Sequence, residues 1–206
     1  MDARAHNKLF VPVHVGAITL KHRVVMPPLS RLRAEWPSGV PSDLNVEYYC
    51  QRASDGGLIF TEATAISPSA RGYRGAPGIY SDEQVTGWRR VTEAVHAKGG
   101  YMFVQLWHAG RTTHIVVTGE EPVTASVDPT YWADLSILVV TPDGFSQPSP
   151  HRALGAAEIA GIIEQYRAAA VNAKKAGSVC RSIATTGAPS MASMRADTPT
   201  TPLRGE

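Results

Sequence analysis

Polar and aromatic residues interrupt an apolar run in the segment 101–111, "YMFVQLWHAGR". Tyr101 to Val104 are aromatic, thioether or β-branched, as in a buried strand, but Gln105 follows them directly and Trp107 and His108 come next. A side-chain amide can both donate and accept hydrogen bonds. The segment therefore has residue types that suit the binding of a polar ligand at the end of a strand.

Two other apolar runs end in a similar way. Residues 24–26 lead into Pro27–Arg31, and residues 58–60 lead into Thr61–Thr64, a run that includes Ala63. In parallel α/β sheets and in barrels, ligands lie at the carboxyl ends of the strands. Three such strand ends predict one shared site.

The two prolines give the first of these strand ends a defined backbone. Pro27 and Pro28 cannot donate hydrogen bonds to a sheet, so pairing ends after Met26. The backbone groups around Leu29 and Ser30 are then free to meet a flat polar ligand. Two alternatives stay open: the prolines form only a rigid turn, and Gln105 and Thr61 only satisfy neighbouring loop backbone.

Metal binding is not predicted. His108 and His114 have no carboxylate or cysteine partner at a suitable spacing. The only two cysteines, Cys50 and Cys180, form neither a metal-binding pair nor a disulfide framework. A reducing cytoplasm is the expected compartment.

Apolar strands and amphipathic helices alternate along the chain. Residues 13–20 predict a hairpin, and helices are expected from Asp43, behind the Ser81–Gln84 capping box, and over 156–176. This alternation is typical of parallel α/β structure, and a doubly wound sheet and a β/α barrel fit it equally well. No G-x-G-x-x-G follows a strand, so a Rossmann-type phosphate site is not expected.

Composition excludes several other classes. Of the 206 residues, 43% are hydrophobic and 18% charged, which is typical of a globular protein, and the net charge is only +2. Nucleic acid and membrane are therefore not expected as partners. The first ten residues have no apolar run, and the longest apolar stretch, near residues 135–140, is too short to span a bilayer.

Four long strings resemble the old yellow enzyme family: "LKHRVVMPPLSR" (20–31), "TEATAISPSARGYRGAPGIYSDEQVTGWRRVTEAVHAKGG" (61–100), "FVQLWHAGR" (103–111) and "TPDGFSQPSPHRAL" (141–154). The resemblance covers about residues 8–177. It implies an FMN-dependent ene-reductase that oxidises NAD(P)H, reduces the C=C bond of small unsaturated carbonyl or nitro compounds, and is built as a β/α (TIM) barrel.

The resemblance also implies roles for particular residues. The residues that match the family's flavin contacts are Pro28, Leu29, Ser30, Ala63 and Gln105, with Ser30 where the family usually has threonine. Gln105 would bond the polar pyrimidine edge of the flavin. Tyr73 and Trp107 resemble residues that wall the substrate pocket, whereas His108 and Arg111 fit a loop-bracing role at least as well.

After Gly177 the resemblance ends. The family continues with a strand that ends in H-x-x-[NH], which grips the substrate carbonyl, and then with a tyrosine that donates a proton. No histidine follows His151 here, so the catalytic residues are unknown. We expect residues 1–177 to form the first three strand–helix units of a truncated barrel, with an N-terminal β-hairpin, and residues 178–206 to form a divergent, disordered tail.

Two origins of this change stay open, a frameshifted or mis-predicted reading frame and a truncated paralogue. The alternative to an enzyme is an inactive fragment that acts at most as an interaction module. We expect the chain as written to bind FMN weakly, to lack ene-reductase activity, and to self-associate through its open sheet edge.

Overall fold

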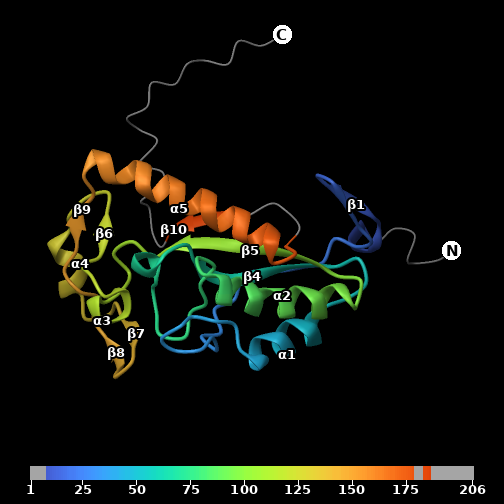
Figure 1. Cartoon of the computed structure of the whole chain (residues 1–206), viewed down its shortest axis with the longest axis horizontal. Helices are drawn as coiled ribbons and strands as arrows, with labels where there is room; N and C mark the ends of the chain where they lie inside the picture. The colour runs from blue at the N-terminus through green and yellow to red at the C-terminus, as the bar shows by residue number, and fades with distance from the viewer. Residues whose placement is uncertain (1–7, 179–182, 187–206) are drawn as a thin grey trace, which may run out of the picture.

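The computed structural model describes residues 8–178 and 183–186, and its centre is a parallel sheet with the strand order β10-β5-β4-β3 (Figure 1). The strands are β3 (Val25–Met26), β4 (Leu58–Ala65), β5 (Tyr101–His108) and β10 (Ile183–Thr186). Helix α1 (Asp43–Arg52) connects β3 to β4, α2 (Asp82–His96) connects β4 to β5, and α5 (Ala156–Lys175) precedes β10. The predicted parallel α/β alternation is confirmed.

Local sequence signals define where the first two helices begin. The Ser81 hydroxyl accepts the Gln84 N–H at 3.3 Å, and the Gln84 amide oxygen accepts the Ser81 N–H at 3.2 Å. At α1 the Asn45 side-chain oxygen accepts the Ser42 N–H at 2.9 Å. Each helix therefore satisfies backbone donors that would otherwise lack partners, and the predicted capping box at Ser81 is confirmed.

One face of the sheet is covered by α1, α2 and α5. Met102, Val104 and Leu106 of β5 point into this core and are at most 1% exposed. They meet Trp88 of α2, whose indole N–H donates to the Gly78 carbonyl at 3.0 Å, and Ala169 of α5. Alternate residues of β5 therefore face the helices, and the others face the opposite side of the sheet.

A hairpin covers the amino end of that opposite face. Strands β1 (Val13–Val15) and β2 (Ile18–Leu20) pair antiparallel, as predicted, and Ile18 and Leu20 pack with Leu58 and Phe103. In Figure 1 this hairpin lies at one end of the sheet and the short elements that follow β5 lie at the other. The carboxyl ends of β4 and β5 are therefore at the end of the face that the hairpin does not cover.

Three features differ from the sequence-based expectation. Strands β4 and β5 run on past residues 60 and 106, where polar residues had indicated strand ends. Residues 109–155, for which the sequence pattern predicts no helix or strand, contain α3 (Ile115–Thr118), β6 (Val123–Thr124), α4 (Pro129–Ala133), β7 (Val139–Thr141), β8 (Gly144–Ser146) and β9 (Arg152–Ala153). These elements are too short to leave a periodic pattern. Two 3-10 turns, Lys8–Phe10 and Pro68–Ala70, complete the described elements.

The third difference concerns the segment 178–206, expected to be a disordered tail. Four of its residues form β10, which pairs in parallel with β5 from Ile183 opposite Gln105 to Thr186 opposite His108. This strand differs from the expected disorder at 183–186, and the division of the chain after residue 177 stays a prediction. Residues 179–182 and 187–206, and with them Cys180, lie outside the described residues. Among those that are described, no helix is long and apolar enough to cross a membrane.

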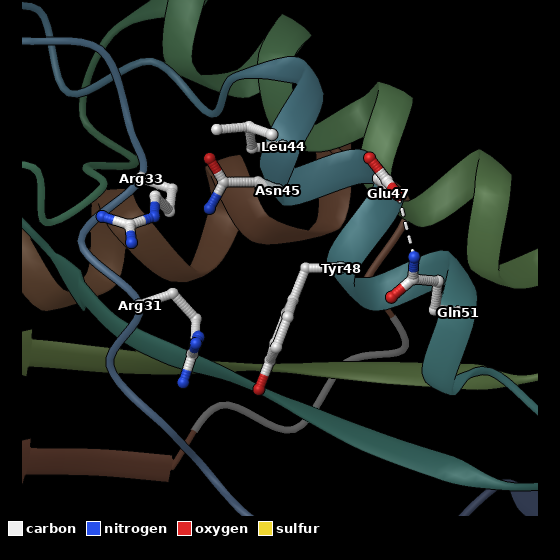
Figure 2. A pocket seen from close by; sticks show the side chains of 7 residues that line it. All are labelled: Arg31, Arg33, Leu44, Asn45, Glu47, Tyr48 and Gln51. Carbon is white, nitrogen blue, oxygen red and sulfur yellow. Dashed lines mark hydrogen bonds between the residues drawn. The ribbon is translucent and has the colours of Figure 1, made fainter.

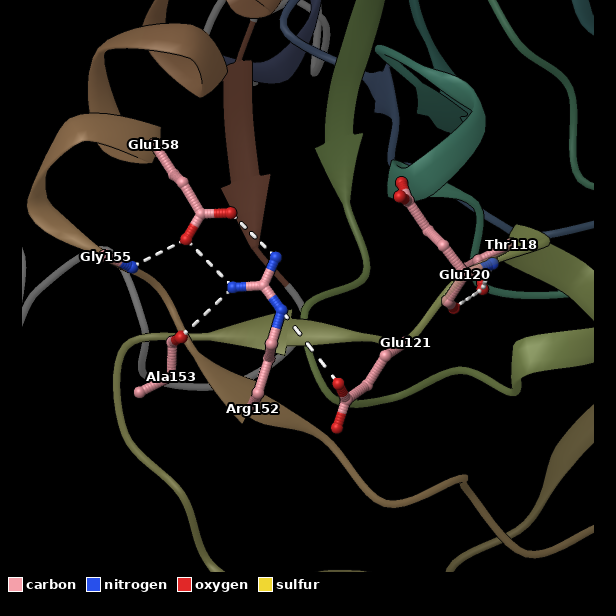
Figure 3. Close-up of polar contacts among 7 residues, drawn as sticks. All are labelled: Thr118, Glu120, Glu121, Arg152, Ala153, Gly155 and Glu158. Carbon is pink, nitrogen blue, oxygen red and sulfur yellow. Dashed lines mark hydrogen bonds and ion pairs between the residues drawn. The ribbon is translucent and has the colours of Figure 1, made fainter.

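A charged group closes the amino end of α5 (Figure 3). The Arg152 guanidinium donates to both oxygens of Glu158, at 2.8 and 2.7 Å, and the Gly155 N–H donates to Glu158 at 2.7 Å. Mainly through Arg152, these bonds lower the pKa of Glu158 from 4.5 to about 2. The ionised form of Glu158 is therefore favoured in the folded chain.

This pKa shift makes a contribution to stability that depends on pH. Because the folded pKa is depressed, the contribution is present above about pH 4.5 and is lost as the pH falls towards 2. We expect Glu158→Gln to lower the thermal unfolding midpoint at pH 6, and the difference from wild type to shrink between pH 4.5 and 2. A difference that stays constant over this range would contradict the assignment.

Candidate functional site

Ala63 and Gln105 lie side by side at the carboxyl ends of neighbouring strands. The register of β4 and β5 pairs Ala63 with Gln105 and Ala65 with Trp107. Gln105 and Trp107 are two residues apart and point to the face opposite the helices, and Ala63 packs with Trp107 on that face. The structure thus brings three of the predicted site residues together.

An irregularity in β4 shapes this strand end. The register with β5 shifts between Phe60 and Ala63, which places Thr61 and Glu62 at a bulge. The Thr61 hydroxyl accepts the Gln105 backbone N–H at 3.0 Å and donates to the Glu62 carbonyl at 2.9 Å. Thr61 therefore does satisfy neighbouring backbone, the alternative considered from the sequence.

The Gln105 side chain behaves differently. It is half-buried, and within the described part of the chain its amide makes no hydrogen bond. An amide held between strands without a protein partner keeps its donor and its acceptor for another molecule. This arrangement favours the ligand-binding interpretation of Gln105 over the structural one.

The segment after β3 presents its backbone at the same end of the sheet. Pro28 is half-buried, whereas Leu29 is 47% exposed and Ser30 is exposed. The next two backbone N–H groups, of Arg31 and Leu32, donate to one oxygen of Glu62 at 2.8 and 3.1 Å. The carboxylate of β4 thus ties the predicted ligand-contacting segment to the strand that carries Ala63.

Glu62 is the main polar group that the sequence did not single out. Its side chain is only 1% exposed, and burial raises its pKa, while the N–H groups of Arg31 and Leu32 oppose that rise. The side-chain amide of Asn45 donates to its other oxygen at 3.1 Å, and the Tyr49 hydroxyl contacts that oxygen at 3.5 Å. The signal available in the sequence was an acid beside Ala63, the one charged residue of this strand.

Two aromatic residues wall one side of the face. Trp107 is 6% exposed, and its ring centroid lies 5.5 Å from that of Tyr73. Leu32 and Ala63 pack against the same cluster. Gly72 permits this arrangement, because a Cβ atom built there would lie 1.8 Å from Cη2 of Trp107. The predicted wall residues therefore adjoin Ala63.

His108 and Arg111 brace the chain. His108 Nδ1 accepts the Gly110 N–H at 3.0 Å, and burial lowers the pKa of His108 to about 4, so its ring is neutral near neutral pH. Arg111 pairs with Asp128 at 3.2 Å and lies 4.5 Å from the centre of the Tyr131 ring. These contacts favour the bracing interpretation of both residues. Among the described residues no group of three His, Cys, Asp or Glu side chains could hold a metal ion.

A hollow of about 230 Å³ lies between the segment after β3 and helix α1 (Figure 2). Arg31 and Arg33 extend from the segment, Asn45 and Tyr48 extend from α1, and the Arg31 guanidinium lies 4.8 Å from the Tyr48 ring centre. Its lining includes neither Ala63 nor Gln105. The predicted site is therefore distinct from this hollow.

Comparison with known proteins gives consistent results. The family model described as "NADH:flavin oxidoreductase / NADH oxidase family" matches residues 8–179. The chain is 46% identical over 173 residues to 12-oxophytodienoate reductase 7 of Oryza sativa subsp. japonica, covering 82% of this chain and 42% of the relative. It is 45% identical over 174 residues to the flavin oxidoreductase hxnT of Emericella nidulans, covering 82% and 43%.

A solved structure agrees with these relatives. The old yellow enzyme homologue from Zymomonas mobilis is 44% identical and matches with a TM-score of 0.77, over 83% of this chain and 46% of that one. The chain thus spans less than half the length of the curated relatives that it matches.

The contact between Gly72 and Trp107 can be tested by mutation. Gly72→Ala places a methyl group where the indole ring lies, so we expect a loss of about 1–3 kcal/mol in the free energy of unfolding, measured in urea. Gly161→Ala in α5 is the matched control, since a Cβ atom there meets nothing within 4 Å. Equal stability of Gly72→Ala and wild type would contradict the described packing.

Proposed function

Because the chain belongs to the NADH:flavin oxidoreductase / NADH oxidase family, which contains the old yellow enzymes, we propose that it carries the flavin-ring site of an FMN-dependent NAD(P)H oxidoreductase. In this proposal β3, β4 and β5 are the first strands of a β/α barrel. The site lies at their carboxyl ends, where barrels of this type bind ligands.

The observation that carries the proposal is the unpaired amide of Gln105 beside Ala63. The pyrimidine edge of a flavin alternates carbonyl oxygens with an N–H group, so one amide can pair with both kinds of group. Ala63 has a side chain small enough to let a flat ring approach β4. The Leu29 and Ser30 backbone, and the Ser30 hydroxyl, supply further polar contacts from the segment after β3.

When bound, FMN supplies hydride transfer between a nicotinamide and the C=C bond of an α,β-unsaturated carbonyl or nitro compound. The residues of this chain hold the cofactor ring and shape the substrate site. Trp107 and Tyr73 form an apolar wall that excludes water from one side of the site and positions a small unsaturated substrate. No residue of the chain is assigned as proton donor or as the group that binds the substrate carbonyl.

The remaining parts of the proposal follow from the family and the composition. NADH or NADPH serves as reductant, the substrate is a small molecule, and the compartment is the cytoplasm. Cys50 is a free thiol, which fits a reducing environment. The ribityl phosphate of FMN would be held by later strands of the barrel, since such sites lie near strands seven and eight.

The proposal is tested in a chimera, in which residues 1–177 are joined to the C-terminal part of the Zymomonas mobilis homologue. We expect this chimera to bind FMN, and Gln105→Leu to weaken binding by about 1–3 kcal/mol, because a buried polar edge of the ring loses its partner. Gln51→Leu is the control, since Gln51 is exposed and bonds Glu47 at 2.8 Å. FMN titration followed by fluorescence measures both.

Equal FMN affinity in wild type and Gln105→Leu would remove Gln105 from the site. The wall assignment is tested in the same chimera, where changing Tyr73 or Trp107 should alter the preference among enone substrates more than the flavin content. Loss of flavin with an unchanged substrate profile in Trp107→Ala would show that Trp107 supports the cofactor instead.

A further inference from the structure

Glu62 is a buried carboxylate whose hydrogen bonds converge from two separate parts of the chain. One oxygen accepts the backbone N–H groups of Arg31 and Leu32, and the other accepts from Asn45 of α1. Within the described residues it forms no ion pair. A carboxyl group this deeply buried is tolerated only if its oxygens are hydrogen-bonded, so these donors stabilise the folded state.

The backbone that Glu62 holds has an unfavourable conformation. Leu32 has a φ of 54° and is the one non-glycine residue with positive φ in the described chain. This left-handed region brings the Cβ atom of an L-residue too close to its own backbone, and such strain persists only when the surroundings enforce it. The Leu32 N–H is one of the two groups that Glu62 accepts.

The other side of this turn is closed by Gly75. A Cβ atom at Gly75 would lie 2.6 Å from the Leu32 carbonyl oxygen, and the Ala34 N–H donates to the Gly75 carbonyl at 3.0 Å. The turn is therefore enclosed between Glu62 and Gly75. Leu29 and Ser30 come immediately before this turn in the chain, and Leu32 itself packs in the same cluster as Ala63.

We propose that Glu62 is a positioning residue: its carboxylate, by accepting the N–H groups of Arg31 and Leu32, holds the left-handed turn at Leu32 and so places Leu29 and Ser30 over Ala63. The inference rests on the proposed function in one respect, that Leu29 and Ser30 contact the flavin. The holding of the turn by Glu62 does not depend on it.

Glu62 is itself immobilised by its neighbours. Its backbone N–H donates to the hydroxyl of Tyr49 at 2.7 Å, and Tyr49 is fully buried. Asn45, which is 1% exposed, donates to Glu62 through its nitrogen while its oxygen caps α1 through the Ser42 N–H. The orientation of Asn45 is thus set at both ends. Glu62 connects α1, β4 and the turn into one rigid unit.

The test is residue-resolved amide hydrogen exchange on the chain 1–206 without flavin. Glu62→Met keeps a side chain of similar length but removes every acceptor, and Glu62→Gln keeps one oxygen. We expect the exchange rates of the Arg31 and Leu32 amides, each divided by that of Val91 in α2, to rise about tenfold or more in Glu62→Met. The rise should be smaller in Glu62→Gln.

Val95→Ala is the matched control, because Val95 is a fully buried residue of α2 that makes no hydrogen bond to the turn. It should lower global stability and leave the ratios unchanged. If Glu62→Met does not fold, as judged by circular dichroism, the test is made on Glu62→Gln. In that variant the same exchange-rate ratios should rise by about threefold. If the ratios in the variant used for the test stay at the wild-type value, the proposal is overturned.

FMN titration of the chimera separates this inference from the proposed function. Faster exchange together with weaker FMN binding in Glu62→Met supports both. If exchange is faster in Glu62→Met but the wild-type chimera binds no FMN, the result supports the holding of the turn by Glu62. It also contradicts the proposed function. Unchanged exchange with normal FMN binding leaves the proposed function intact and overturns the role of Glu62.

Discussion

The arrangement of this site depends on one buried hydrogen-bonded group, the carboxylate of Glu62. Through it β4 holds the segment after β3, and through Asn45 it also holds the start of α1. Without these bonds, a carboxyl oxygen and two backbone N–H groups would be left without partners in the protein interior, which is costly. The need to satisfy this buried carboxyl group therefore defines the path of the chain past Leu29 and Ser30.

The two faces of the sheet contact different parts of the protein, because alternate residues of each strand point to opposite sides. Met102, Val104 and Leu106 build the core against the helices, whereas Gln105 and Trp107 face the other way. The hairpin closes only the amino end of this second face, where it meets Phe103. Polar and aromatic groups are thereby concentrated at the carboxyl end, the position at which α/β folds bind ligands.

Local chemistry made much of this predictable from sequence. Ser81 and Gln84 act on each other within one helical turn, so the start of α2 could be predicted, and the resemblance to known flavoproteins correctly indicated the family. Glu62 could not be assigned a role, because its partners lie 13 to 31 residues away in the chain. For the same reason Thr61 and Glu62 were taken for a strand end, although burial and hydrogen bonds keep them within β4. The roles of Pro28, Leu29, Ser30, Ala63 and Gln105 in flavin binding stay predictions.

The central claim is that a flavin ring lies against Ala63 with its polar edge on Gln105, and the nuclear magnetic resonance signal of the Gln105 side-chain amide tests it most directly. In the chimera labelled with ¹⁵N, Gln105→Leu identifies that signal by its disappearance. We expect the Gln105 signal to shift when FMN is added, and the signal of Gln51, which is exposed on α1, to stay in place. An unshifted Gln105 signal in a protein that has bound FMN would contradict the account.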